Sequence, residues 1–466
     1  MQFLRLARSL LLCSAAALPA SALTVEDAII YVLETNPDIQ AAEANKQAIE
    51  FELDRAQAFR TPKFRLEGWA GSSRDFGSNS AGPGSPVEGY EVSAIVSQRI
   101  FDGFFTRSEI ERQAYRIDAA ALRVLERSEF LALEAVRLYA DVLRMQQLLG
   151  LARSNVAYHR EVVSRIQGAF DTGVVGPGDL IQAEERLLVA EDVLLEFELD
   201  YDDTRAFFLE VVGVEAESLG SVPSVASRMP SSLDAALSTA RRTNPTIRFM
   251  QADVGSAESL SRRVAHNRFP TVDLEVEGRY GEDVEGLEGT VNDVSVGLKF
   301  RYEFQGRANK ANRQEHVRRV NESRARLLSQ TRLVEREMRQ SWSNMETARE
   351  RVGLLSEQVA ELRELRATYE TEFQVGTRSL LDVLNTQNAL FRAEASLVNT
   401  RVLDTYVKYR VLAASGVLLR SLGIEPPEDS EIYAREKVGA PPVNAAETGA
   451  RFDARDFRSW RKSLDN

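Results

Sequence analysis

The sequence has very few of the residues that bind metals or form redox centres. Among 466 residues it contains one cysteine, Cys13, and three histidines, His159, His266 and His316. A single cysteine excludes an internal disulfide and a redox-active cysteine pair, and the histidines lack the spacing of a zinc site. The sequence also has no Walker A motif and no G-x-S-x-G motif. We therefore expect no metal, no cofactor and no enzymatic activity.

Long apolar runs and an excess of positive charge are missing as well. No segment contains 18 or more consecutive apolar residues, which argues against a transmembrane helix. The formal net charge is −12, and Lys and Arg are interspersed with acidic residues, so we expect no binding to nucleic acid. A short apolar run at residues 10–18 follows Arg5 and Arg8 and precedes Ala20-Ser21-Ala22. This pattern predicts a cleavable signal peptide at residues 1–22, whose removal leaves no thiol.

Proline is absent between Pro86 and Pro177 and again between Pro270 and Pro426. Because proline breaks helices, each stretch can hold a helix of about 65–70 residues, followed by a glycine-marked turn and a returning helix. We place these helical hairpins at residues 104–213 and 307–422. Residues spaced by seven, with small residues beside them, predict a coiled-coil seam in the returning helices. They are Leu180, Leu187, Leu194, Val383, Leu390 and Leu397, with Ala183 and Ala190. The helices alone would equally fit a soluble antiparallel coiled coil.

The chain is an internal duplication. Thr35-Asn36-Pro37 recurs as Thr243-Asn244-Pro245, 208 positions later, and the offset is 203 for Gly173 and Gly376. About five additional residues in the first copy account for the change, and the Gly/Ser/Pro-rich residues 77–89 are the natural place for them. Matches at these two offsets, in the same order in both halves, indicate two copies of a single structural unit.

Each copy has the same predicted order: an opening helix, a β-hairpin and a long helical hairpin. Thr24 with Asp27, and Ser231 with Asp234, resemble capping boxes at the start of the opening helices, which Asn-Pro then breaks. We divide the chain into a first repeat at residues 23–228, a second repeat at 229–423 and a tail at 424–466. The tail is rich in proline, alanine and charge, so we expect it to be loosely ordered.

Alternating apolar and polar residues predict the β-hairpins at residues 63–101 and 271–304. In the second hairpin, three apolar residues alternate with Asp273, Glu275 and Glu277. Each chain would thus have four strands of about 9–11 residues, the length that a tilted strand needs to cross a membrane. The apolar face would contact outer-membrane lipid, and the three acids would face the lumen.

Four strands cannot close a barrel, and an open edge in lipid leaves backbone groups unpaired. Two chains supply 8 strands and three supply 12. An 8-stranded barrel is filled by its own side chains, whereas a wider one holds water. A conducting pore therefore favours three chains or more.

Two further motifs are the run from Ser97 to Gly103 and Val375-Gly376-Thr377 with Asp382-Val383-Leu384. The first resembles the strand-to-helix junction and the second the periplasmic turn of the TolC family of outer-membrane channel-tunnels. The chain resembles this family from about Leu23 to Gly423, and the motifs occur in the family's order. The resemblance implies a mainly α-helical chain with a transmembrane β-barrel contribution. Three chains would form a homotrimer with a 12-stranded barrel in the cell outer membrane, and with an α-helical tunnel and the termini in the periplasm.

By resemblance, the periplasmic tip is where the tunnel closes and where an adaptor docks. Asp382 matches a position whose carboxylate faces the pore axis, and Asn385 follows one turn later, where the family often has an acid. Asp382 could instead cap the returning helix. Arg378 matches an arginine that ties neighbouring hairpins together, with Asp179 as its expected partner, although a solvated loop arginine is the simpler interpretation. The expected docking tip comprises Val375, Gly376, Thr377, Gly173 and Val174.

The resemblance implies the outer-membrane exit duct of a tripartite export system. Its partners would be a periplasmic adaptor (membrane fusion) protein and an inner-membrane ABC transporter or proton-driven pump. We expect type I protein secretion, because the run from Thr377 to Asn388 resembles the secretion-associated branch and Leu12 before Cys13 does not fit a lipoprotein signal. The alternatives are the outlet of a multidrug or small-molecule efflux pump and, of another class, a structural periplasmic coiled-coil protein.

Overall fold

The computed structural model describes residues 22–74, 86–284 and 289–442. Nearly all of the expected signal peptide, with Cys13, therefore lies outside the described residues, as do most of both strand-connecting loops. The chain divides into two compact units. Unit 1 comprises Met1–Ile39, Arg127–Ser238 and Arg336–Pro426, and unit 2 comprises Gln40–Glu126, Thr239–Glu335 and Pro427–Asn466.

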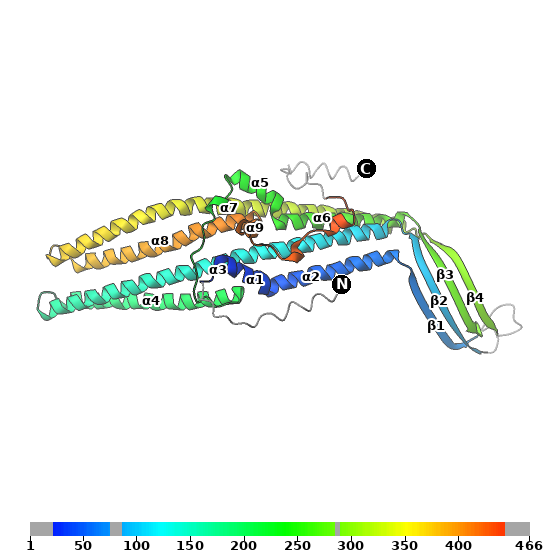
Figure 1. Ribbon diagram of the computed structural model, residues 1–466, viewed down its shortest axis with the longest axis horizontal. Coiled ribbons are helices and arrows are strands. Elements are labelled where there is room, and N and C mark those ends of the chain that lie inside the picture. Colours follow the sequence, from blue (N-terminus) through cyan, green and yellow to red (C-terminus); the bar gives the residue numbers. More distant parts are fainter. Residues whose placement is uncertain (1–21, 75–85, 285–288, 443–466) are drawn as a thin grey trace. The chain divides into compact units, whose positions relative to one another are not determined.

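The elements follow the same order in both halves of the chain (Figure 1). The first half contains α1 (Val25–Thr35), α2 (Pro37–Gln57), η1 (Ala58–Arg60), β1 (Lys63–Ser73), β2 (Val87–Phe101), α3 (Phe105–Asp171) and α4 (Pro177–Val212). After η2 (Ala226–Arg228), the second half contains α5 (Leu233–Thr243), α6 (Pro245–Val264), η3 (Ala265–Arg268), β3 (Thr271–Glu282), β4 (Thr290–Arg301), α7 (Gly306–Gln374) and α8 (Leu380–Ala414). The two proline-free stretches form helices of 67 and 69 residues, which agrees with the lengths expected from the sequence.

Local chemistry explains where the opening helices start and break. Thr24 and Asp27 form the expected capping box at the start of α1. Asn36 and Asn244 separate the two parts of each opening helix, and each accepts a hydrogen bond from the backbone two residues later, at 3.0 Å. The second predicted capping box does not form, and a simple serine cap takes its place. Ser232, not Ser231, accepts the backbone N–H of Ala235 at 3.2 Å, because α5 begins at Leu233.

The main core of unit 1 joins residues that are far apart in the sequence. Ile29, Tyr139, Phe208 and Leu412 are all buried in one cluster. The Tyr139 hydroxyl lies 2.6 Å from the Leu23 carbonyl, so the large aromatic side chain is buried without an unpaired polar atom. This cluster holds α1 against the two helical hairpins within unit 1.

The predicted seam residues are buried on α8, whereas on α4 the alanines are buried and Leu180, Leu187 and Leu194 are only half-buried. Val383, Leu390 and Leu397 are buried on α8, and the alanines Ala183 and Ala190 are buried on α4. Small residues at these positions let neighbouring helices approach closely. The buried residues form separate apolar clusters along the hairpins: Ala183 lies in one with Leu380 and Leu384, and Leu390 lies in another with Leu397.

Unit 2 contains an antiparallel sheet of four strands in the order β1-β2-β3-β4 (Figure 1). The strands are 11, 15, 12 and 12 residues long, so β1 has the expected length and the other three are longer than expected. The register places Phe64 opposite Val96, Val96 opposite Val276, and Val276 opposite Val296. One face of the sheet is therefore apolar across all four strands.

The tail is not loose over its described part, which corrects the sequence-based expectation for residues 424–442. It forms the short helices η5 (Glu428–Ser430) and α10 (Ala434–Lys437), after α9 (Leu418–Leu422) at the end of the second repeat. Ala434 is fully buried in the core of unit 2. The Asp118 carboxylate accepts the backbone N–H groups of Tyr433, Ala434 and Arg435, at 2.9–3.2 Å. Hydrogen bonds to side chains on α2 and α3 thus order this part of the tail, although its polar composition suggested a loose chain.

Candidate functional site

The turn between α7 and α8 is the first part of the candidate site. Gly376 adopts a left-handed conformation with φ of 79°, which lets α7 end and the chain reverse. The Thr377 N–H donates to the Glu372 carbonyl at 2.9 Å, and this bond closes the turn. Val375 is 71% exposed at the tip. In the first repeat, Gly173 has φ of 75° and Val174 is likewise exposed, so both turns present an apolar side chain to their surroundings.

Asp382 lies in the first turn of α8 but is not its N-cap. Ser379 is the cap, and its hydroxyl accepts the Asp382 N–H at 3.2 Å and donates to the Asp382 carboxylate at 2.8 Å. The capping interpretation of Asp382 is therefore replaced by one in which a serine caps the helix and orients the carboxylate. Asn385 is exposed one turn later on the same helix.

Arg378 and Asp179 do not meet within the chain. Arg378 donates to the Glu372 carboxylate at 2.8 Å and lies 3.9 Å from the Asp382 carboxylate. Its guanidinium also lies over the Tyr369 ring, 4.1 Å from the centroid. Asp179 lies in the first turn of α4, whose cap is Gly176 with no side-chain hydrogen bond. The expected pair between Arg378 and Asp179 is therefore not formed within one chain, where Arg378 has Glu372 as its partner.

Sequence reasoning missed a buried polar network that joins the two helical hairpins of unit 1. The Gln387 amide donates to the Asn155 side chain at 2.8 Å and accepts from Arg366 at 3.0 Å. The Tyr158 hydroxyl donates to the Glu370 carboxylate at 2.7 Å, and burial raises the pKa of this phenol, so it stays protonated. The only available signal was the presence of Asn155 and Gln387 at core-facing helical positions.

His159 lies beside this network and is almost completely buried. Within the described residues, neither of its ring nitrogens has a hydrogen-bond partner. Burial lowers the pKa of His159, and the nearby charge of Arg186 lowers it further. The imidazole is therefore neutral at pH 7 and acts as a packing group, with its ring edge-on to Tyr158 at 5.6 Å.

The three acids of β3 share one face of the sheet, as the alternation predicted. Two of them have cross-strand partners that the sequence did not reveal. Asp273 pairs with Arg99 of β2 at 2.8 Å, and Glu275 pairs with Lys299 of β4 at 3.2 Å. Glu277 lies between Ile95 and Ser295 in the register. This polar face is consequently less negative than the acids alone suggested.

The described residues contain no group of three or more His, Cys, Asp or Glu side chains arranged to hold a metal ion. Within the same part of the chain, no helix combines the length and the apolar character needed to cross a membrane.

Comparison with known proteins gives relatives of one kind. The chain is 25% identical over 343 residues to the outer membrane efflux protein BepC of Brucella suis, covering 71% of this chain and 74% of BepC. Its fold matches the Campylobacter jejuni CmeC outer membrane channel with a TM-score of 0.77 and 13% identity, over 93% of this chain and 90% of that one. It also matches the open state of the Neisseria gonorrhoeae MtrE outer membrane channel, with a TM-score of 0.70 and 17% identity, over 85% and 89%.

The family comparison covers both repeats. The model of the outer membrane efflux protein family matches residues 29–213 and 236–404, which is well over half of the chain. The expected fold class, mainly α-helical with four antiparallel strands per chain, is confirmed by the structure and by the fold matches. The chain therefore belongs to the outer membrane efflux protein family, which places it in the outer membrane as a channel protein and not as an enzyme.

Proposed function

We propose that a homotrimer of this chain is the outer-membrane exit duct of a tripartite export system. The observation that carries the proposal is the four-stranded sheet, whose outer strands β1 and β4 each pair on one side only in the described chain. In lipid, an unpaired edge leaves backbone N–H and C=O groups without partners, so the sheet requires further strands. Three copies supply a closed 12-stranded barrel.

The exposed apolar face of the sheet supports membrane insertion. On β4, Val294, Val296, Leu298 and Phe300 are 67–76% exposed. A continuous apolar surface of this kind is unusual on a monomeric water-soluble protein. It suits the acyl region of a membrane, while the opposite face carries the ion pairs of β3 and lines an aqueous lumen.

A second unpartnered surface supports the trimer outside the sheet. Ile181, Leu188, Leu195 and Leu199 form a stripe along α4 and are 63–66% exposed. Their spacing of seven and four places them on one side of the helix. We infer that each stripe packs against a neighbouring copy, in the same way that the seam residues pack within the chain.

The tip supplies the proposed constriction and the proposed docking site. Three copies would place three Asp382 carboxylates around the axis, with Asn385 as the next polar layer, and the carboxylate ring would favour cations. Val375, Gly376 and Thr377 of one turn, with Gly173 and Val174 of the other, offer exposed apolar groups to a periplasmic adaptor. The adaptor would connect the duct to an inner-membrane transporter.

Two cargo classes have support from different observations. The relative BepC is named an efflux protein, which supports small-molecule efflux driven by an inner-membrane pump. The tip run from Thr377 to Asn388 supports type I protein secretion through an ABC transporter. We favour efflux, because the similarity to BepC extends over 71% of the chain, whereas the run from Thr377 to Asn388 comprises only twelve residues. Loss of the gene should then raise drug susceptibility and leave the secretion of a type I substrate unchanged.

Single-channel recording tests the duct itself. The mature protein is reconstituted in a planar bilayer, and the wild type is compared with Asp382→Ala and with a matched control, Glu361→Ala, on the exposed side of α7. We expect a cation-selective channel whose selectivity falls in Asp382→Ala and persists in the control. Equal selectivity in all three proteins would show that the constriction does not lie at Asp382. A folded oligomer that forms no channel would refute the duct.

A further inference from the structure

An aromatic cluster marks the junction where the sheet of unit 2 meets its helices. Phe101 ends β2, Phe104 precedes α3, and Phe269 precedes β3. The three rings lie 5.7–6.2 Å apart in edge-on pairs. Phe101 is opposite Val272 in the register, which places it on the apolar face of the sheet. The cluster therefore continues the apolar face up to the start of the helices.

The backbone at this junction is held in a conformation that costs energy. Gly103 and Phe104 both have positive φ angles, 65° and 68°. Gly103 is required there, because a Cβ would lie 2.8 Å from the His266 carbonyl oxygen. No comparable steric requirement explains the positive φ of Phe104, which is uncommon for a bulky residue. The Phe104 side chain is 55% exposed. Strain that keeps an aromatic ring at a surface points to a binding role for that ring.

Arginines lie one turn beyond the aromatic cluster. Arg107 and Arg262 share the Glu111 carboxylate, at 3.1 and 2.8 Å. Arg112 and Arg263 share Glu109 in the same way, both at 2.7 Å. Four guanidinium groups against two carboxylates leave this cluster with a net charge of about +2. The side chain of Arg107 is 69% exposed, so part of that charge is accessible.

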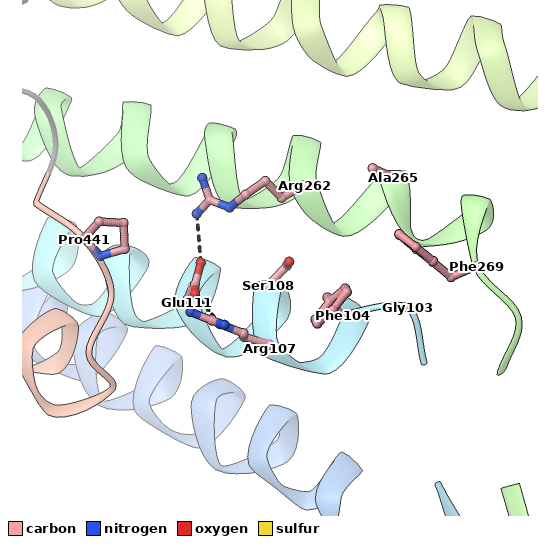
Figure 2. Close-up of a pocket in the computed structure, with 9 residues that line it drawn as sticks. All are labelled: Gly103, Phe104, Arg107, Ser108, Glu111, Arg262, Ala265, Phe269 and Pro441. Atoms are coloured by element: carbon pink, nitrogen blue, oxygen red, sulfur yellow. Dashed lines mark hydrogen bonds and ion pairs between the residues drawn. The ribbon is translucent and has the colours of Figure 1, made fainter. Parts of the chain in front are cut away.

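A pocket of about 450 Å³ lies between the rings and the arginines. Phe104 and Phe269 form one part of its wall, and Arg107, Arg262 and Ser108 form another, together with the Glu111 carboxylate that the two arginines share (Figure 2). Pro441 lies at its edge, held by a hydrogen bond from the Tyr115 hydroxyl to its carbonyl. This volume lies in the range of small-molecule sites, and the wall changes from apolar to cationic over about one helical turn.

We propose that this pocket binds the headgroup end of an anionic glycerophospholipid. The inference rests on the proposed function, since it requires the apolar face of the sheet to lie in a membrane. The phosphate would then meet Arg107 and Arg262, while the first part of an acyl chain would lie on Phe104 and Phe269. Aromatic residues at the membrane boundary with cations just beyond them match the order of acyl chain, glycerol and phosphate in a lipid.

Two other occupants fit less well. Residues 443–466, which follow the pocket edge in the sequence, contain five Lys or Arg and four Asp or Glu, so they bring no net negative charge to match the arginines. Free phosphate would match the arginines but would leave the aromatic wall without a partner. A lipid with an anionic headgroup supplies a phosphate for the arginines and an acyl chain for the aromatic wall.

Native mass spectrometry of the full-length mature protein tests the proposal. The detergent-solubilised oligomer is titrated with phosphatidylglycerol and with phosphatidylcholine of the same acyl chains. We expect preferential retention of phosphatidylglycerol and a loss of about tenfold in its affinity in Arg107→Gln/Arg262→Gln. The matched control is Arg319→Gln/Arg326→Gln, because these arginines also share one carboxylate, that of Glu322, but lie on α7 without an aromatic wall. Equal retention of both lipids, or equal loss in both double variants, would overturn the proposal.

Phe104→Gly separates lipid from free phosphate. Glycine suits the positive φ at this position, so we expect the fold to remain intact while phosphatidylglycerol retention falls. Inorganic phosphate that displaces the lipid equally well from wild type and Phe104→Gly would show an ion site instead. If phosphatidylglycerol bound only after deletion of residues 443–466, the tail would be the occupant of the pocket in the intact chain, and the proposal would be wrong. A protein that forms channels but shows no lipid preference would refute this inference alone, and the proposed duct would stand.

Discussion

Glu129 is a buried carboxylate in unit 1, and within the described part of the chain its hydrogen-bond partners are backbone N–H groups. It is 5% exposed and accepts the backbone N–H groups of Leu418 and Leu419, at 3.0 and 3.4 Å. Burial raises the pKa of Glu129 to about 7, although the two N–H groups act in the opposite direction. One side chain on α3 thus positions α9, and its charge state changes near neutral pH.

The pKa of Glu129 predicts how stability depends on pH. The pKa is higher in the folded state than in the unfolded state, so the folded state binds the proton more tightly. This stabilisation is complete below about pH 4.5 and is lost as the pH rises through about 7, a change of roughly 3 kcal/mol. We expect the thermal midpoint of the wild type to fall between pH 5.5 and 8.5, and that of Glu129→Gln to change much less. Circular dichroism at 222 nm gives both midpoints, and parallel pH curves would contradict the assignment.

For single residues, the sequence predicts contacts between neighbours in the chain and misses contacts between residues that are far apart in it. The helix breaks at Asn36 and Asn244 were predictable because proline and the capping side chain are neighbours. The capping role of Ser379 was missed because Asp382, three residues on, is also a good cap. The partners of Glu129 lie 289 and 290 positions away, and no local pattern connects them.

At the scale of elements, alternation predicted the strands but not their pairing. The apolar and polar faces of β3 follow from period two alone. The ion pair between Arg99 and Asp273 depends on the register of β2 with β3, which are joined through residues 174 positions apart. A one-residue slip would have exchanged the faces, so register had to come from the structure. The face that carries the acids of β3 was therefore predicted to be more negative than its ion pairs make it.

The tail is the element for which composition was misleading. Its proline and charge content predicted a loose chain, yet several polar groups in its described part have specific partners on α2 and α3. Asp429 pairs with Lys46 at 2.7 Å, and the Tyr433 hydroxyl donates to Glu50 at 2.6 Å. Composition measures how polar a segment is, but it does not show whether another element supplies hydrogen-bond and ion-pair partners for that segment.

Two deletions test whether this strap, residues 427–442, stabilises unit 2. Removal of residues 427–466 exposes the apolar cluster around Ala434 and leaves the Asp118 carboxylate without three backbone donors. We expect a loss of roughly 2–4 kcal/mol and faster proteolysis of α2 and α3. Removal of residues 443–466 is the matched control and should leave stability and proteolysis close to the wild type. Equal effects of the two deletions would show that the strap contributes nothing of its own.

At the scale of the whole molecule, the decisive inference was the number of strands. Four strands and two open edges could be read from the sequence, and the structure adds that the edges belong to one continuous sheet. The requirement for other copies then follows from backbone hydrogen bonding in lipid. The exposed stripe on α4 was not predicted, because the same leucine spacing describes residues that pack within the chain and residues that pack between chains.

The α4 stripe gives a direct test of the trimer. Leu188→Glu/Leu195→Glu places two charges on each chain at a surface that we expect to be buried between copies. Burying a charge without a partner costs more than burying a leucine gains, which is about 1.5–3 kcal/mol per side chain. We expect native mass spectrometry to show monomers in the glutamate variant and trimers in a matched control, Leu188→Met/Leu195→Met, which keeps the surface apolar. Helical content should be unchanged in both, since the stripe lies outside the core of the chain. Intact trimers in the glutamate variant would mean that the stripe faces another partner, and the edges of the sheet would then have to hold the three copies together alone.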